Sequence, residues 1–162
     1  MAGLVCGLHV NPEGGVPKHP VESLVVHANG CQGDKQNDTR HHGGPNKAVC
    51  LMELRILHRL QDAGHPIGPG TTGENLLIDG LEDGVLDVGV KLQIGQVAMT
   101  ITGDAPPCKT IQASFQEGRF KALSHRDRFG QTRWYASVQD GGTIRIGDTV
   151  SVLSASGPVG NP

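Results

Sequence analysis

The sequence contains few aromatic residues, and it has no apolar run long enough to span a bilayer. Aromatic residues make up 3% of the 162 positions, whereas glycine accounts for 24 residues and proline for 10. This composition is typical of short strands joined by tight turns rather than of a few long helices. With 36% hydrophobic residues, a chain of this length can bury the core of one globular domain. We therefore predict a single, mainly β domain over residues 1–162.

The sequence also lacks a strong excess of charge of either sign. The formal net charge is -2 and the sequence pI is about 6.4, so there is no broad basic field for nucleic acid or an anionic membrane. The first residues, MAGLVCGLHVNPEGG, contain no basic leader, and their apolar run ends at Asn11-Pro12, which favours a first strand over an export signal. We expect a cytoplasmic protein with no nucleic-acid or membrane partner.

The four cysteines form no paired motif. Cys6, Cys31, Cys50 and Cys108 lie far apart, which excludes a zinc knuckle and a thioredoxin-type redox motif. Packing inside a strand and a helix accounts for Cys6 and Cys50, so we assign no chemistry to either. Cys31 lies beside a polar loop and is a spare candidate for a site near that loop. Cys108, which follows two prolines, is the remaining thiol.

Alternation of apolar and polar residues predicts several short strands. The predicted strands are Leu4–Val10, Ser23–His27, Asn75–Ile78 and Trp134–Val138, with hairpins around Gly95-Gln96 and between TIRIGD and TVSVL. Residues 119–128 are expected to form a loop or a short helix. Strands near both ends of the chain and several glycine-rich corners indicate a distorted β-barrel.

One prominent helix is predicted over about residues 45–63, with short additional helices elsewhere. Its apolar residues recur at helical spacing and are Val49, Met52, Ile56, Leu57 and Leu60. Pro45 suits the first turn of a helix, and Gly64 suits its end. The predicted fold is therefore mainly β with one main helix.

Five segments of the sequence resemble those of the MOSC domain, the C-terminal module of molybdenum cofactor sulfurases, in order and spacing. These segments are GDKQNDTRHHGGPNKAV (33–49), TTGENLLIDGL (71–81), IGQVAMTITGDAPPCKTI (94–111), TRWYASV (132–138) and GTIRIGD (142–148). The chain is similar to small single-domain bacterial members of the family. The resemblance implies a distorted, pyruvate-kinase-like β-barrel and a pocket for a molybdenum cofactor.

The resemblance implies that the cysteine of the Pro-Cys motif, Cys108, is a metal ligand or a sulfur carrier. Molybdenum favours a thiolate donor, and Pro106 and Pro107 stiffen the approach to this cysteine. The adjacent Lys109 is expected to favour the thiolate form. The alternative is that Cys108 is a small thiol buried in the core, as most lone cysteines are. We interpret Cys108 as the catalytic and metal-binding residue.

Polar residues around the glycine-rich segments are candidates for binding the pterin and its phosphate. They are Asp34, Gln36, Asp38, His41, His42, Gly43, Lys47, Glu74, Asn75 and Arg133. A hydrolytic metal site at His41 and His42 is the rival interpretation, although adjacent histidines usually diverge. Glu74 and Asn75 are equally suited to bracing the barrel, and charges on a loop are often simply solvated.

The chain departs from the family pattern at two places. Many relatives have a basic residue shortly before the Pro-Cys motif, where this chain has Asp104-Ala105-Pro106. Many also have glycine before the Trp-Tyr pair and arginine two residues after it, where this chain has Arg133 and Ser137. Arg133 is therefore expected to restore one positive charge if its side chain points into the pocket.

By analogy with the family, the predicted activity is an oxidoreductase that reduces N-hydroxylated compounds. The alternative within the family is a sulfur carrier, in which Cys108 holds a persulfide and delivers sulfur for molybdenum cofactor or metal-sulfur cluster maturation. A third hypothesis is a non-catalytic barrel that binds a partner protein. The first two require a small-molecule substrate, and an electron-donor protein or a cysteine desulfurase as partner. Pyridoxal phosphate is expected only on a partner enzyme.

Overall fold

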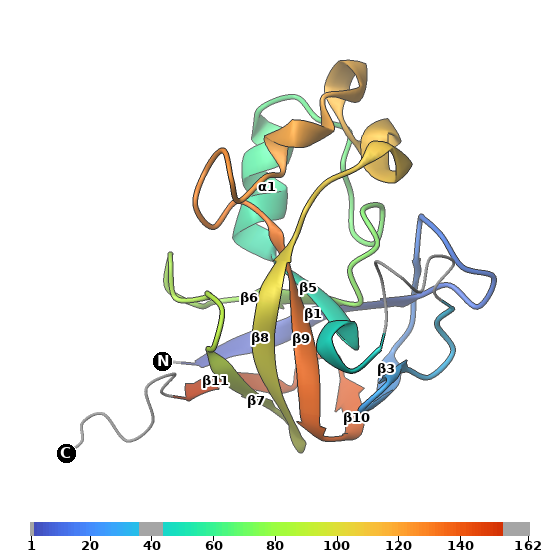
Figure 1. Cartoon of the computed structure of the whole chain (residues 1–162), viewed down its shortest axis with the longest axis vertical. Coiled ribbons are helices and arrows are strands. Elements are labelled where there is room, and N and C mark those ends of the chain that lie inside the picture. The colour runs from blue at the N-terminus through green and yellow to red at the C-terminus, as the bar shows by residue number, and fades with distance from the viewer. Residues whose placement is uncertain (1, 36–43, 154–162) are drawn as a thin grey trace.

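Seven strands close into a mixed barrel in the computed structural model, which describes residues 2–35 and 44–153. Their order around the barrel is β11-β7-β8-β9-β5-β6-β1, and antiparallel pairing of β11 with β1 closes it. The barrel strands are β1 (Ala2–Val10), β5 (Val49–Glu53), β6 (Leu76–Asp79), β7 (Lys91–Ile94), β8 (Val97–Ala105), β9 (Arg133–Asp140) and β11 (Thr149–Leu153). Only β5 and β6 run parallel within this set. The predicted β-barrel is confirmed (Figure 1).

Shorter elements surround the barrel. Strand β2 (His19–Pro20) pairs with the end of β1. A separate sheet contains β3 (Ser23–His27), β4 (Gly30–Cys31) and β10 (Gly142–Arg145). The helices are α1 (Leu54–Asp62) and the 3₁₀ turns η1 (Pro45–Lys47), η2 (Lys109–Ser114), η3 (Gln116–Gly118) and η4 (Phe120–Ala122). No helix in the described ranges combines the length and the apolar character needed to cross a membrane.

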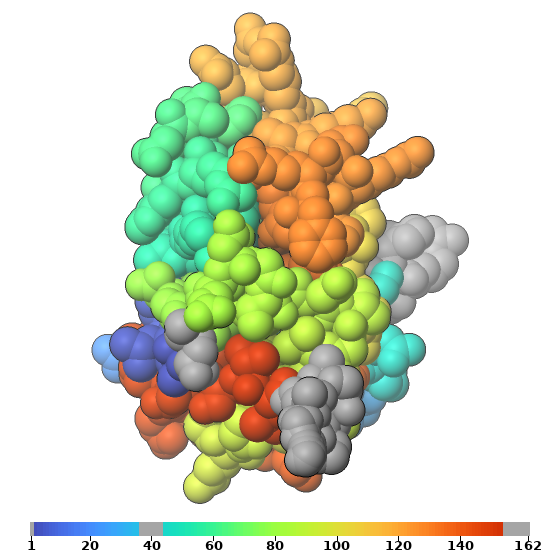
Figure 2. Space-filling model, turned by 90° about the vertical axis from the view of Figure 1, so that its left-hand side faces the viewer, coloured from blue at the N-terminus to red at the C-terminus, as the bar shows by residue number. Residues whose placement is uncertain are grey.

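Two large apolar clusters, and a small third one of Cys50, Ala105 and Tyr135, hold these elements together. The larger one fills the barrel with side chains that include Leu51, Leu92 and Trp134, each almost fully buried. The second lies at one end of the barrel, where α1 packs against the segment of residues 111–123 through Leu57, Phe115 and neighbouring side chains. In the space-filling view, α1 and the segment that follows η4 lie side by side over this end (Figure 2). This packing fixes the segment that begins at Cys108.

The helix predicted over 45–63 is wrong in its first half. Residues Val49–Glu53 form β5, and the helix begins only at Leu54. Strand β5 lies between β6 and β9 and is buried along its whole length. A strand covered on both faces is continuously apolar, so its pattern is indistinguishable from that of a buried helix. The run VCLM therefore satisfied the helical spacing by coincidence.

The remaining predicted strands are present, but one predicted pairing is wrong. Strands β10 and β11 match the two segments that were expected to pair as a C-terminal hairpin. In the described structure β10 instead pairs with β3, whereas β11 pairs with β7 and β1. Hydrophobic alternation identifies a strand and its buried face, but it does not identify the partner across a closed barrel.

Candidate functional site

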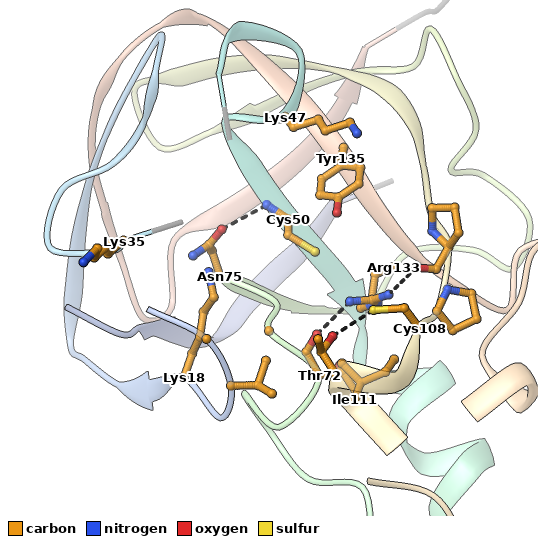
Figure 3. A pocket seen from close by; sticks show the side chains of 16 residues that line it. Lys18, Lys35, Lys47, Cys50, Thr72, Asn75, Cys108, Ile111, Arg133 and Tyr135 are labelled. Atoms are coloured by element: carbon orange, nitrogen blue, oxygen red, sulfur yellow. Dashed lines mark hydrogen bonds between the residues drawn. The ribbon is translucent and has the colours of Figure 1, made fainter. Parts of the chain in front are cut away.

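A cavity of about 500 Å³ opens where the end of β8 meets β5 and β9. Its wall is formed by residues from the segments 15–18, 72–75 and 106–111, by side chains from β5 and β9, and by Lys35 and Lys47 (Figure 3). This volume lies in the range that holds small organic ligands and cofactors. The cavity therefore brings the Pro-Cys motif together with the glycine-rich segment around residue 73.

Cys108 lies on the cavity wall with an exposed thiol. Strand β8 ends at Ala105, and Pro106 and Pro107 carry the chain to this cysteine. The sulfur lies 2.8 Å from the hydroxyl oxygen of Thr110, and either group can be the donor. Lys109 is exposed and lies outside the cavity wall. The described structure thus places Cys108 at a cavity rather than in the core.

Arg133 fixes the segment that leads to this thiol. Its side chain is buried on the cavity wall, and its position in β9 faces Ala105 across the β8–β9 pairing. The guanidinium donates to the carbonyl oxygen of Thr72 at 2.7 Å. It also donates to the carbonyl oxygens of Ala105 and Pro106, both at 3.1 Å. One side chain therefore ties the Pro-Cys segment to the loop on the opposite side of the cavity.

Cys50 and Tyr135 form the next part of the wall, and the sequence analysis missed both. They are cross-strand partners in the β5–β9 pairing and both line the cavity. Burial raises the pKa of the Cys50 thiol to about 11, although the nearby Arg133 opposes this shift. Burial also raises the pKa of the Tyr135 hydroxyl, and Lys47 lies 5.2 Å from the centre of its ring. Both Cys50 and Tyr135 are therefore uncharged at neutral pH.

A signal for Tyr135 was present in the sequence, whereas the signal for Cys50 was hidden. Arg133 and Tyr135 are two residues apart, so their side chains point to the same face once the predicted strand Trp134–Val138 is extended by one residue to Arg133, as in β9. If one of them reaches the cavity, the other does too. Cys50 was assigned to a helix, and the cross-strand relationship with Tyr135 appears only when residues 49–53 are recognised as a strand.

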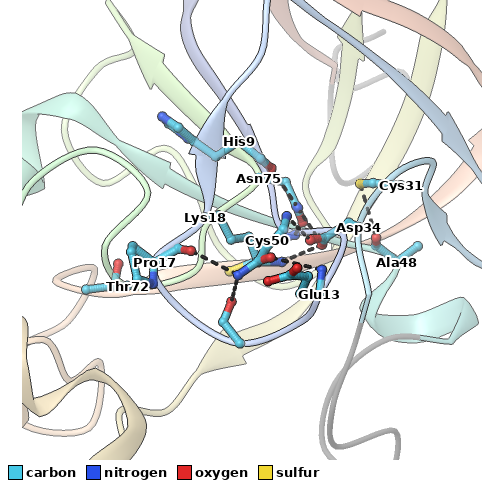
Figure 4. Close-up of polar contacts among 12 residues, drawn as sticks. His9, Glu13, Pro17, Lys18, Cys31, Asp34, Ala48, Cys50, Thr72 and Asn75 are labelled. Carbon is cyan, nitrogen blue, oxygen red and sulfur yellow. Dashed lines mark hydrogen bonds and ion pairs between the residues drawn. The ribbon is translucent and has the colours of Figure 1, made fainter.

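A buried network of hydrogen bonds and one ion pair lies behind the part of the cavity wall that contains Lys18 and Asn75 (Figure 4). Lys18 and Asp34 form an ion pair, with side chains 7% and 1% exposed. The Asp34 carboxylate also accepts from the Asn11 backbone N–H at 2.8 Å and from the Asn75 amide at 2.9 Å. The Asn75 oxygen accepts from the backbone N–H of Cys50 at 3.0 Å. Asn75 and Lys18 line the cavity, so the predicted residues Asp34 and Asn75 hold its wall in place.

The structure does not bring Glu74 to the cavity. Its side chain is fully buried, where the carboxylate accepts from the Gly70 backbone N–H at 2.6 Å and from the Thr72 hydroxyl at 2.8 Å. This carboxylate braces the loop that carries Thr72. The imidazole of His9 is buried nearby, and burial lowers its pKa, although Glu74 opposes this shift.

Several candidates lie outside the described residues, namely Gln36, Asp38, His41, His42 and Gly43. Within the described ranges, no group of three or more His, Cys, Asp or Glu side chains is arranged to hold a metal ion. A metal bound in this part of the chain would therefore have to bring most of its own ligands.

The other two cysteines lie away from the cavity. Cys6 lies in a strand as predicted, but on the exposed face of β1, where its thiol donates to the carbonyl oxygen of Leu77 at 3.3 Å. Partial burial and the nearby Asp79 carboxylate raise the pKa of this thiol. Cys31 is buried and donates to the carbonyl oxygen of Ala48 at 3.6 Å. Burial raises the pKa of the Cys31 thiol to about 12, which leaves it unreactive at neutral pH.

The cavity wall carries positive charge. Lys18, Lys35, Lys47 and Arg133 line it, whereas the described part of the wall includes no carboxylate. Asp34 offsets the charge of Lys18 from behind the wall. Fixed positive charge around a concave site favours an anionic ligand. The described cavity thus combines an accessible thiol, apolar side chains such as Val16 and Ile111, and several cationic side chains on its wall.

The sequence pattern of the MOSC domain matches residues 38–151. The uncharacterized protein YflK from Bacillus subtilis (strain 168) is 26% identical over 144 residues, which cover 88% of this chain and 64% of that protein. Protein YiiM from Escherichia coli (strain K12) is 23% identical over 135 residues, or 81% of this chain and 59% of that protein. This chain therefore spans less than two thirds of the length of both relatives.

Solved structures share the fold. The YuaD protein from Bacillus subtilis superposes with a TM-score of 0.73 at 18% identity, covering 94% of this chain and 96% of that one. YiiM from Escherichia coli superposes with a TM-score of 0.69 at 21% identity, covering 95% of this chain and 70% of that one. At these identities the likeness supports the barrel and says nothing of the ligand.

Proposed function

Because this chain belongs to the MOSC domain family, we propose that its cavity binds a molybdenum cofactor and that Cys108 is the protein ligand of the metal. The observation that carries the proposal is the exposed Cys108 thiol on the wall of a 500 Å³ cavity surrounded by cationic side chains. Thiolate is a suitable donor for a soft, highly charged metal, and a cofactor that supplies its own sulfur ligands needs little more from the protein.

The residues of the cavity fit such a cofactor. Its phosphate is anionic, and the Lys35 and Lys47 side chains can pair with it. The described part of the wall contains no carboxylate that would repel this anionic group. The Asn75 amide already bonds to Asp34 and to the backbone, so it would shape the wall rather than contact the pterin directly.

The proposed reaction is the reduction of an N-hydroxylated base, which consumes electrons and protons and releases water. The bound cofactor would transfer the electrons to the substrate, and an electron-donor protein would then reduce the cofactor again. Val16, Pro107 and Ile111 form an apolar edge near Cys108 against which a small substrate can pack. Tyr135, whose raised pKa keeps it protonated, can donate a hydrogen bond inside the cavity.

Sulfur carriage is the second candidate, and the exposure of Cys108 favours it. A cysteine desulfurase could reach a thiol at the open side of the cavity and leave a sulfane sulfur on it as a persulfide. Pyridoxal phosphate would then reside on that partner enzyme. The same cationic wall would favour the anionic form of the persulfide.

Two analyses of one preparation distinguish these functions. Protein purified from molybdenum-replete cells is assayed for molybdenum by mass spectrometry and for sulfane sulfur by cyanolysis. The cofactor function predicts about one molybdenum per chain, lost in Cys108→Ser and retained in the control Cys6→Ser. The carrier function predicts sulfane sulfur with the same dependence on Cys108 and no molybdenum. If neither is found, or neither depends on Cys108, both functions are rejected.

A further inference from the structure

We propose that Arg133 makes the cavity selective for a negatively charged group beside Cys108. The inference refines the proposed function, because it specifies the charge of the group that binds at the thiol. It concerns only side chains of this protein, so it can be tested without cofactor. The geometry points to Arg133 because the residue is only 5% exposed, lines the cavity and donates to the carbonyl oxygen of Pro106 in the segment that carries Cys108.

Hydrogen bonds hold the guanidinium of Arg133 in place. It donates to the carbonyl oxygens of Thr72, Ala105 and Pro106, which belong to two segments far apart in the sequence. Pro106 is two residues before Cys108, and Figure 3 shows Arg133 beside that cysteine. A buried side chain with three such bonds has little freedom to move away. The positive charge of Arg133 therefore keeps one position beside the cavity, whereas the charge of an exposed side chain moves with that side chain through solvent.

Among the described residues, Arg133 has no carboxylate partner. In the described ranges, none of the ion pairs includes Arg133, whereas Lys18 is paired with Asp34. The buried Nε of Arg133 has no hydrogen-bond partner either. Carbonyl dipoles offset part of the charge, but a buried cation ordinarily has an anionic partner. An anion in the cavity would supply the missing charge.

The charge of Arg133 acts on a group that lines the cavity. Arg133 lowers the pKa of the Cys50 thiol, in opposition to the larger effect of burial. A cation that stabilises one thiolate on the cavity wall also attracts any other anion that comes as close to it, because Coulomb attraction depends on charge and distance and not on chemical identity. We therefore assign to Arg133 a positioning role: it orients the Cys108 segment and sets the sign of charge that the site accepts.

The test compares two alkylating reagents of similar size and different charge. Iodoacetate is anionic and iodoacetamide is neutral. Each alkylates a thiolate by forming a carbon–sulfur bond with loss of iodide. The ratio of their rates at Cys108, measured by peptide mass spectrometry on cofactor-free protein, reports the local potential. Cys6, measured in an Asp79→Asn background, is the internal reference, because it lies away from the cavity and the nearby carboxylate, which would itself disfavour iodoacetate, is then removed. We expect a higher iodoacetate-to-iodoacetamide ratio at Cys108 than at Cys6.

Three variants separate charge from structure. Arg133→Gln keeps hydrogen-bond donors for the carbonyls but removes the charge, and should lower the ratio at Cys108 by roughly 3- to 10-fold. Arg133→Lys keeps the charge and should keep most of the ratio. The exposed Arg119, which is paired with Glu117, gives the control Arg119→Gln, for which we expect no change.

An unchanged ratio in folded Arg133→Gln overturns the proposal. If that variant does not fold, a variant that combines Lys35→Gln, Lys47→Gln and Lys109→Gln decides, because it removes other cations near the thiol: the ratio at Cys108 should stay above that at Cys6, and a fall to the Cys6 value would overturn the proposal. Equal ratios at both thiols at low salt would also overturn it. The proposed cofactor function is unaffected by either result, since it depends on metal retention by Cys108.

Discussion

Cys50 lies directly opposite Tyr135 in the antiparallel pairing of β5 with β9, and both side chains line the cavity that carries Cys108. The protein therefore presents two thiols to one cavity, in opposite environments. Cys108 is exposed at its open side, whereas Cys50 is buried in the sheet. This difference makes the reactivity of the four cysteines the simplest test of the fold around the site.

Selective alkylation should follow this difference. The pKa of Cys50 is raised to about 11, so at pH 8 about one molecule in a thousand carries the thiolate there, and burial blocks access further. In native protein, iodoacetamide should modify Cys108 and Cys6 and leave Cys50 and Cys31 unmodified. All four should react after unfolding in urea. Peptide mass spectrometry checks the pattern, and rapid native labelling of Cys50 would contradict the described packing of β5.

The buried ion pair below the cavity should be important for stability. Asp34→Asn removes the partner of Lys18 and leaves a buried ammonium uncompensated, so we expect the free energy of unfolding to fall by about 3 kcal/mol or more. Asp83→Asn is the matched control, because Asp83 is 76% exposed where it pairs with Arg55. Urea unfolding measures both. A loss for Asp34→Asn no larger than that for the control would show that the network contributes little.

The buried imidazole of His9 predicts a dependence of stability on pH. Burial lowers its pKa below 6.5, so on acidification the unfolded chain gains a proton before the folded protein does. The stability contributed by neutral His9 is present above pH 6.5 and is lost as pH falls below it. Urea unfolding from pH 7.5 to 5 should therefore show a decline that is weaker in His9→Gln. The exposed His27 provides the control His27→Gln, which should retain the wild-type profile.

The turn at Gly70 should tolerate no side chain. Its φ is 79°, and a Cβ there would lie 2.3 Å from the carbonyl oxygen of Lys18. Gly130 has nearly the same φ, 80°, and no atom within 4 Å of its Cβ position. Gly130→Ala should cost about 1 kcal/mol from the left-handed backbone alone, and Gly70→Ala clearly more. Equal losses in thermal or urea unfolding would contradict the close contact between residues 70 and 18.

The sequence was sufficient for the barrel because most strands follow a two-residue alternation, as in β3 and β7. It failed for β5, where both faces are buried and alternation disappears. It also failed for the partners of β10 and β11, because β11 pairs with β1 to close the barrel and β10 pairs with β3 in a separate sheet, both far away in the sequence. Cys108 was found through its motif, whereas Cys50, Tyr135 and Lys18 reach the cavity only through pairing and loop packing. Polar residues in a sequence do not reveal whether they contact a ligand or, like Glu74, brace a turn.

The most direct measurement of the central claim is X-ray absorption at the molybdenum edge, on wild-type protein and Cys108→Ser loaded with the same cofactor preparation. If Cys108 is the protein ligand, wild-type protein should show one more sulfur at bonding distance than the variant, with Cys6→Ser identical to wild type. An equal number of sulfur ligands in wild-type protein and in Cys108→Ser would contradict the account.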